Sequence, residues 1–362
     1  MSAADGTVIG ATRIEDRGPA SSKWNLVLVS EGYTAGELPQ FHQHCQDFLD
    51  HLYGLAPFDE RDVRCAINVH RLDVASNESS ADNPTECDDG DIPTGTTVAT
   101  FFDATFCGSG AIRRLLTVDQ TLVIDTVDDH VPEWDQIIVI VNSTLYGGAG
   151  GAVATTSLAG DWENIAVHEL GHSAFGLADE YEYYVGCGLE TDRNNHPAGE
   201  PSEPNVTLNN DPNTIKWKAR VTDNPMKTSN NVDCSTCDPT TNPFTAATVG
   251  AFEGAHYYHC DAYRPGWDCM MRNFGAFCGV CQQVIRDTLA PFNTPSTLSL
   301  ATPTLSFNDV PEGVQTARAV VFDVASCVDE TFTIIAGPTV LSGPAGTTFA
   351  TPLGLQVVSP PA

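Results

Sequence analysis

Two histidines and a glutamate near the middle of the chain have the types and spacing of a metal site. His168 and His172 are four residues apart, so a helix places both imidazoles on one face, one turn from each other. Imidazoles in this arrangement can bind one Zn²⁺ together. Glu169 lies beside that face, where its carboxylate can take a proton from metal-activated water instead of binding the metal. The stretch therefore predicts a hydrolytic zinc site.

The third zinc ligand has to come from beyond this helix. Asp179 is the nearest candidate, but a continuous helix rises about 1.5 Å per residue and would carry it about 10 Å past His172. Gly176 can take the left-handed conformation that ends a helix and turns the chain back. We therefore expect a helix from about Asp161, as its N-cap, to Phe175, followed by a turn that returns Asp179 to the metal.

The charge of the chain limits its binding partners. The 362 residues include 47 acidic and 17 basic side chains, which give a net charge of −30. This charge argues against nucleic acid or an anionic membrane surface as a partner. No apolar run approaches the roughly 18 residues of a membrane span. The first residues also lack a signal-peptide pattern, so either a leader was removed or the protein is not exported.

Twelve cysteines are a high and even number. Such a number is typical of secreted proteins with disulfides, so we expect a secreted protein whose cysteines are largely oxidised. The alternative is a second, structural zinc, because Cys234-x-x-Cys237 and Cys278-x-x-Cys281 have the internal spacing of a zinc ribbon. Six cysteines lie between residues 234 and 281, and that number favours disulfides.

The apolar pattern predicts the elements that position the site. Unbroken aliphatic runs predict buried strands at 24–30 and 136–142. A further strand is expected at about 63–74, and a strand or turn at 97–106. Apolar residues at helical spacing predict helices near 34–52, 112–127 and 279–289. The segment 151–157, after a glycine-rich turn, has the character of an edge strand that could bind an extended peptide beside the metal.

An acidic stretch between the second strand and the following segment could bind calcium. Asp88, Asp89 and Asp91 offer oxygen ligands for Ca²⁺, with Gly90 between them. The stretch lacks the ligand spacing and the closing glutamate of an EF-hand. We therefore favour a solvated loop and keep Ca²⁺ as the alternative.

Composition divides the chain into three parts. We expect an N-terminal α/β subdomain at 1–157 and a catalytic subdomain with the active-site helix at 158–290. A linker rich in proline and threonine follows, and the β-like pattern of 297–362 predicts a C-terminal β domain. That last part is too short for a complete sandwich.

Taken together, these motifs resemble the IgA-peptidase-type zinc metallopeptidases, a bacterial family related in plan to the metzincins. The resemblance covers about residues 20 to 290 and rests on the segments 26–34, 56–58, 68–70, 146–148, 168–181, 263–265, 269–272 and 277–281. It implies an α/β (α+β) domain with a mixed sheet and an active-site helix. By the same resemblance His168, His172 and Asp179 are the zinc ligands, Glu169 is the general base, and Met270 or Met271 forms a methionine turn under the metal.

We therefore expect a zinc-dependent endopeptidase that hydrolyses peptide bonds of protein substrates. Nothing in the sequence indicates immunoglobulin as its substrate. The alternative is a non-catalytic adhesion or glycan-binding module with a structural metal, but such a site has no need of Glu169.

Two assignments stay open in the sequence. Glu180, His256 and His259 are the alternatives to Asp179 as third ligand. Tyr263 and Arg264 are the candidate donors for a developing oxyanion.

Overall fold

A computed structural model describes residues 3–85, 94–108, 112–182, 195–231, 242–293, 297–300 and 322–325. The chain divides into two compact units, Met1–Asn293 and Thr294–Ala362. In the part of the chain that the structure describes, no helix is long and apolar enough to cross a membrane.

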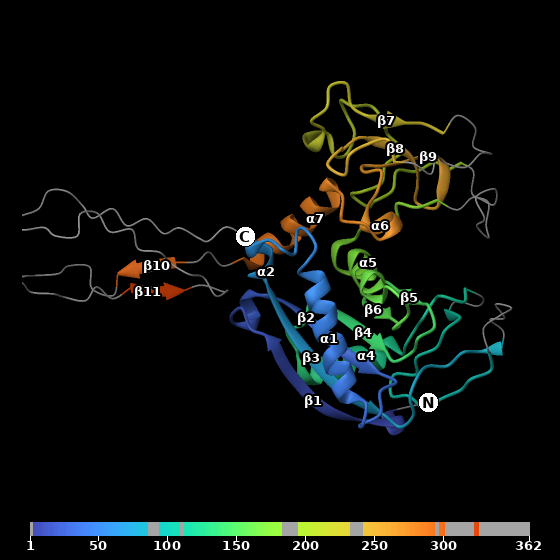
Figure 1. Cartoon of the computed structure of the whole chain (residues 1–362), viewed down its shortest axis with the longest axis vertical. Coiled ribbons are helices and arrows are strands. Elements are labelled where there is room, and N and C mark those ends of the chain that lie inside the picture. The colour runs from blue at the N-terminus through green and yellow to red at the C-terminus, as the bar shows by residue number, and fades with distance from the viewer. Residues whose placement is uncertain are drawn as a thin grey trace, which may run out of the picture. The chain divides into compact units, whose positions relative to one another are not determined.

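A six-stranded mixed sheet forms the centre of the first unit (Figure 1). Its strands are β1 (Gly6–Glu15), β2 (Trp24–Glu31), β3 (Ile67–Ser76), β4 (Gln136–Val141), β5 (Gly148–Ala149) and β6 (Val153–Thr156). Their order is β1-β3-β2-β4-β6-β5. The four inner strands are parallel to one another, whereas β1 and β5 pair antiparallel at the two edges. The expected mixed α/β architecture is confirmed.

Side chains of the inner strands alternate between two buried clusters, one on each face of the sheet. Leu26 and Leu28 of β2 face one cluster, and Val27 and Val29 face the other. Because both faces are covered, β2 and β4 contain unbroken aliphatic runs, which is why they could be identified in the sequence.

Helices cover both faces of the sheet (Figure 1). The first cluster includes side chains of α1 (Leu38–Leu52), α2 (Arg61–Arg64), α5 (Trp162–Phe175), α6 (Met270–Asn273) and α7 (Gly279–Leu289). The second cluster includes α4 (Gln120–His130). Short 3₁₀ turns are η1 (Ala3–Asp5), η2 (Ala20–Ser22), η5 (Lys218–Arg220) and η6 (Ala290–Phe292).

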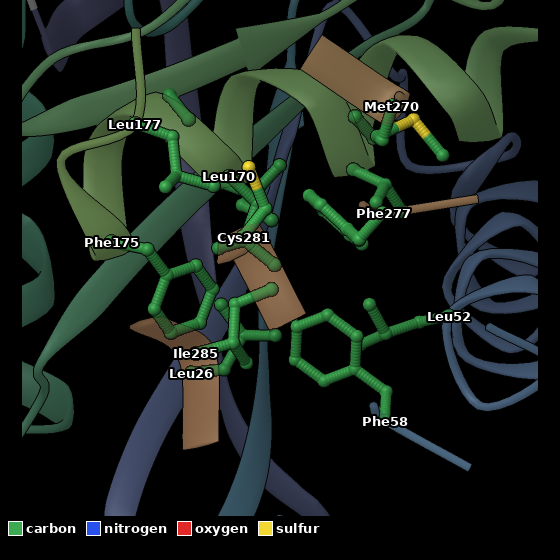
Figure 2. Close-up of a cluster of buried hydrophobic side chains, with 14 of the residues drawn as sticks. Leu26, Leu52, Phe58, Leu170, Phe175, Leu177, Met270, Phe277, Cys281 and Ile285 are labelled. Atoms are coloured by element: carbon green, nitrogen blue, oxygen red, sulfur yellow. The ribbon is translucent and has the colours of Figure 1, made fainter. Parts of the chain in front are cut away.

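Packing against α7 holds α5, the helix that contains His168 and His172, in place. Figure 2 shows Leu170 and Phe175 of α5 beside Phe277, Cys281 and Ile285. All five side chains are buried in the first cluster. Burial of aromatic and aliphatic side chains at this junction stabilises the position of α5 by roughly 1.5–3 kcal/mol per residue.

A smaller three-stranded sheet follows the active-site helix in the chain. It consists of β7 (Thr228–Ser229), β8 (Ala251–Ala255) and β9 (Tyr258–Arg264), in that order. Strands β8 and β9 form a hairpin whose loop contains only His256 and Tyr257. The sequence did not predict this hairpin.

Two expected elements differ from the structure. The strand expected at 63–74 starts only at Ile67, because the residues before it form the short helix α2 and the turn that ends it. The helix expected at 112–127 is α4, which starts at Gln120 because the Asp119 carboxylate caps it by accepting from Leu122 N at 3.1 Å. Residues 97–106, expected as a strand or turn, are mostly irregular, with a turn at 101–102 and isolated bridges at Thr105.

The expected edge strand at 151–157 is also corrected. Strand β6 is an inner strand, paired with β4 on one side and β5 on the other. The edge is therefore β5, which lies within the glycine-rich turn.

In the second unit, β10 (Thr297–Leu300) pairs antiparallel with β11 (Phe322–Ala325). The candidate Ca²⁺ stretch 88–91 lies outside the described residues.

Replacement of Ile138 by alanine should destabilise the first unit by about 2–5 kcal/mol, because Ile138 is fully buried in β4 and its loss leaves a cavity. The matched control is Ile9→Ala in β1, where the isoleucine is 58% exposed and the change should stay within about 0.5 kcal/mol. Urea unfolding of both variants measures the difference. Equal destabilisation would contradict the assignment of β4 to the centre of the sheet.

Candidate metal centre

The end of helix α5 turns the chain back toward its own histidines. The helix ends at Phe175, as expected, and Gly176 takes a left-handed conformation with φ of 60°. Its N–H donates to the carbonyl of His172 at 3.1 Å, and Leu177 N–H donates to Gly171 at 3.1 Å. These bonds satisfy carbonyls that the helix end would otherwise leave unpaired. Asp161 stands at the N-cap position, but its side chain does not cap the helix.

The side chains of His168, His172 and Asp179 converge on one point. Nε2 of His168 lies 3.1 Å from Nε2 of His172, and Asp179 Oδ1 lies 3.0 and 3.2 Å from these two nitrogens. Ligands of a tetrahedral Zn²⁺, at bond lengths of about 2.0–2.2 Å, are roughly 3.3 Å apart. The three atoms therefore have the separation that one zinc ion requires.

Backbone carbonyls fix the orientation of both imidazoles. Nδ1 of His168 contacts the carbonyl of Met270 at 3.0 Å, and Nδ1 of His172 contacts the carbonyl of Leu177 at 2.7 Å. A carbonyl can only accept, so each Nδ1 carries the proton. In the neutral form of each imidazole, Nε2 then has the lone pair that can bind a metal. Support of this kind is usual around metal-binding histidines.

Electrostatics favour a cation at the point of convergence. Burial alone would raise the pKa of Asp179, but the hydrogen bonds and charges of His168 and His172 hold it well below its ordinary value. Burial opposes protonation of His172, yet Asp179 and Glu169 raise the pKa of this imidazole to about 9. The site therefore attracts positive charge. A metal that binds Nε2 of His172 has to displace a proton, so metal binding here is coupled to proton release.

Glu169 lies beside the histidines, on the side of strand β5. Burial raises the pKa of its carboxyl, and Asp179 adds to this, while His168, His172 and Arg114 oppose it. The glycine-rich turn can lie close to Glu169 and His172 because its glycines have no Cβ. A Cβ at Gly150 would lie 2.9 Å from His172 Cβ and 3.2 Å from Glu169 Oε2.

Two adjoining hollows of about 260 and 360 Å³ open at the site. Both are lined by Arg114, Gly148, His168, Glu169 and Tyr181. Arg272 and Phe274 line the smaller one, and Asp179 and Tyr257 line the larger one. The sequence did not indicate Arg114, Arg272 or Tyr257 as site residues.

Tyr257 reaches the site through the β8–β9 hairpin loop. Its hydroxyl donates a short hydrogen bond to Asp179 Oδ2. His256 and Tyr257 have φ of 55° and 73°, as a two-residue type I′ turn requires, although neither is glycine or asparagine. The loop is hydrogen-bonded to residues 179–181, the segment that contains the third candidate ligand. His256 N–H donates to Asp179 O, and Tyr257 N–H donates to Tyr181 O. Unfavourable backbone geometry of this kind concentrates at functional sites.

Both methionines of the expected methionine turn lie beneath the helix. Met270 provides the carbonyl that holds His168, and the Met271 carbonyl accepts from Glu180 N–H at 2.7 Å. A Cβ on Gly171 would lie only 2.5 Å from the sulfur of Met271. Gly171, next to His172, therefore gives Met271 room to pack directly against α5.

The alternative candidates lie elsewhere. His256 contacts His196 at 2.9 Å, and the buried His259 contacts the carboxylate of Glu182. Tyr263 lies in β9, paired with β8. The buried side chain of Arg264 donates to the carbonyls of Glu253 and Gly254. None of these four residues lines either hollow.

The expectation of largely oxidised cysteines fails around α6 and α7. Cys269, Cys278 and Cys281 are buried free thiols that surround Glu180, and Cys45 is a further buried free thiol. The expectation was wrong here because a count of cysteines does not reveal which of them meet a carboxylate. Cys65, Cys107 and Cys260 are disulfide-bonded. Cys87, Cys187, Cys234, Cys237 and Cys327 lie outside the described residues.

The sequence was also compared with known families and proteins. The model of one family, described as IgA Peptidase M64, matches residues 12–233 and 240–289. These ranges contain His168, Glu169, His172, Asp179 and Tyr257. No curated protein matches the chain.

Asp179→Ala should weaken zinc binding at this site by more than the roughly 10–100-fold that loss of a supporting residue causes, because it removes one of three converging ligands. His256→Ala is the control and should bind zinc as tightly as the unaltered protein. Competition with a chromophoric chelator measures both affinities. A tight zinc in Asp179→Ala together with a weakened one in His256→Ala would show that the ligand set is wrong.

Proposed function

The chain belongs to the IgA peptidase M64 family, and we propose on that premise that it is a zinc-dependent endopeptidase. Family membership makes it a metallopeptidase, a hydrolase whose substrates are proteins. It gives no support to the alternative of a non-catalytic adhesion or glycan-binding module. The observation that carries the proposal is the convergence of His168, His172 and Asp179 beside the carboxylate of Glu169.

Zinc is the metal that fits this ligand set best. Two imidazoles and one carboxylate leave a fourth position open, which is the arrangement of catalytic rather than structural zinc. When bound, Zn²⁺ would lower the pKa of a water molecule and polarise the scissile carbonyl. Helix, glycine turn, third ligand and methionine turn together support a metzincin-like plan for the catalytic part. Nothing in the described residues supports a role for Ca²⁺.

Glu169 is proposed to move the proton during hydrolysis. Its side chain lines the larger hollow together with His168, His172 and Asp179, but it is not one of the three converging ligand residues. Burial raises its pKa, so it is a stronger base than an exposed glutamate. It takes a proton from the attacking water and later gives that proton to the leaving amine. Both transfers need only this one side chain.

Strand β5 is proposed to bind the substrate main chain. It is the last strand of the sheet. Gly148 N–H already donates to the Arg114 carbonyl at 3.0 Å, and the stretch from Ala149 to Gly150 lines the larger hollow next to Glu169. An extended peptide can add to such an edge as a further strand, which would carry a peptide bond past the metal ligands. This proposal replaces the edge strand expected at 151–157.

Tyr257 is proposed as the donor for the developing oxyanion, in place of Tyr263 or Arg264. Its hydroxyl lies at Asp179 and faces the hollow that contains Glu169 and His172. A phenol so placed can turn from the ligand carboxylate to a substrate oxygen with a change of one side-chain torsion. The unfavourable backbone of the hairpin loop supports a functional role for this residue.

Further expectations from the sequence are kept as proposals. The division into 1–157, 158–290 and 297–362, a secreted location, and the lack of nucleic-acid partners rest on composition alone. The same holds for the β character of the C-terminal part.

Glu169→Gln should leave the metal bound and lower peptidase turnover by the roughly 10²–10⁴-fold typical of a lost general base. Digestion of casein, with zinc content measured on the same samples, gives both values. Addition of a chelator to the unaltered enzyme is the control and should abolish cleavage. Turnover close to normal in metal-replete Glu169→Gln would remove Glu169 from the mechanism.

Tyr257→Phe should keep zinc and lower kcat by about 10²–10³-fold, because it removes only the hydroxyl that donates to the oxyanion. Tyr263→Phe is the matched control and should retain full activity, since Tyr263 lines neither hollow. Steady-state kinetics on one peptide substrate compare the two. If Tyr263→Phe is the impaired variant, the donor has been assigned to the wrong tyrosine.

A further inference from the structure

We propose that Glu180, Cys269, Cys278 and Cys281 form a second metal site, distinct from the hydrolytic centre, that binds Zn²⁺ and has a structural role. Glu180 follows Asp179 in the chain, Cys269 directly precedes α6, and Cys278 and Cys281 lie at the start of α7. One ligand atom from each lies within 4.8 Å of all the others.

The separations of these atoms fit tetrahedral zinc. Sγ of Cys269 and Sγ of Cys281 are 3.8 Å apart. Glu180 Oε1 lies 3.2 Å from Cys281 Sγ and 3.9 Å from Cys278 Sγ. Zinc bonds of about 2.3 Å to sulfur and about 2.0–2.2 Å to oxygen put neighbouring ligand atoms roughly 3.5–3.8 Å apart.

The same separations do not fit a disulfide. Bonded sulfur atoms are only about 2.05 Å apart. All three cysteines are free, although disulfides form at Cys65 and Cys260 in the same chain. Three thiols also cannot all pair with one another, whereas a single ion can bind all three.

A buried carboxylate oxygen points to the missing partner. The Glu180 side chain is fully buried, and Asn205 donates to its Oε1 at 2.9 Å. Among the described residues, its Oε2 has no hydrogen-bond partner. Burying a carboxylate without a full set of partners is costly, and a cation beside it removes that cost.

Burial raises the pKa of Cys269 and Cys281, but partial positive charges point at the sulfur atoms, which bind metal as thiolates. Cys278 N–H donates to Cys269 Sγ at 3.3 Å. Cys278 is the N-cap of α7, an eleven-residue helix, and Cys281 lies in its first turn, where the helix dipole favours negative charge. The buried guanidinium of Arg264 interacts electrostatically with Glu180 and offsets part of the remaining negative charge.

The ligand set indicates both the metal and its role. Thiolates select soft or borderline ions, and a tetrahedral set of three sulfurs and one oxygen is suited to zinc. All four positions are filled by buried protein side chains, so no position remains for substrate. A closed site of this kind is structural rather than catalytic.

The role of this second site follows from its neighbours in the chain. Asp179 and Glu180 are adjacent, and their carboxylates face the two different ligand groups. Cys269 precedes Met270, whose carbonyl orients His168. An ion held by Glu180 and Cys269 would therefore fix the third ligand and the methionine turn of the hydrolytic centre at once. This set differs from the zinc ribbon considered in the sequence, because Glu180 and Cys269 replace Cys234 and Cys237.

Cobalt substitution tests the second site without relying on activity. The full-length protein should bind two Co²⁺ per chain, and one of them should show sulfur-to-cobalt charge-transfer absorption in the near ultraviolet. The hydrolytic centre has no sulfur ligand, so this absorption reports the second site alone. In His172→Ala the absorption should persist with one Co²⁺ per chain. In Cys281→Ser it should be lost or strongly reduced.

Cys45→Ser is the matched control, because Cys45 is also a buried free cysteine but lies outside the ligand group. It should keep two Co²⁺ and the full charge-transfer absorption. Thiol alkylation of the native zinc protein provides a measurement that needs no variant. Cys269, Cys278 and Cys281 should be protected and should react after zinc is removed by a chelator.

Two results would overturn the proposal. One is an unaltered protein that is replete with metal and shows no charge-transfer absorption with Co²⁺. The other is a peptide map of unreduced protein with a disulfide between any two of the three cysteines. Neither result bears on the peptidase proposal, which fails instead if the unaltered, zinc-loaded protein does not cleave casein.

Discussion

Three electron-rich atoms held close together govern the structure around the proposed hydrolytic centre. Nε2 of His168, Nε2 of His172 and Oδ1 of Asp179 are 3.0 to 3.2 Å apart and face one another. Lone pairs at this separation repel unless a proton or a cation lies between them. A proton on His172 or a bound cation relieves this repulsion. Rigid support then holds the three atoms in place: a helix for the histidines, a left-handed glycine for the turn, and two carbonyls that accept from the imidazole Nδ1 atoms.

That support comes from parts of the chain that are far apart in sequence. Strand β5 of the sheet lies beside Glu169, and Tyr257 of the β8–β9 hairpin contacts Asp179. Helix α7 packs against α5. The metal centre is thus a junction of three substructures. The segment after Gly176 lies between them, and the alternation of its side chains sends Asp179 toward the histidines and Glu180 toward the cysteines.

The local part of this arrangement could be predicted from the sequence. The spacing of His168 and His172 predicted the helix. Gly176 predicted the end of that helix and the return of Asp179 to the histidines. Strands β2 and β4 were predictable because both faces of the sheet are buried. By contrast, the β8–β9 hairpin was missed because its turn has positive φ at His256 and Tyr257, where the usual turn signal is asparagine or glycine. The thiols near Glu180 were misread because contacts between distant segments leave no periodic pattern in the sequence.

The contact between His168 and the carbonyl of Met270 spans 102 residues of chain. This length has a consequence for the order in which the protein is made. A ribosome completes the histidine helix long before it adds the residue that orients the first histidine. For much of translation, the growing chain therefore contains the signature of a hydrolytic centre without its supporting frame. His168 acquires the orientation seen in the folded protein only when the segment that carries Met270 has been made and has folded onto α5.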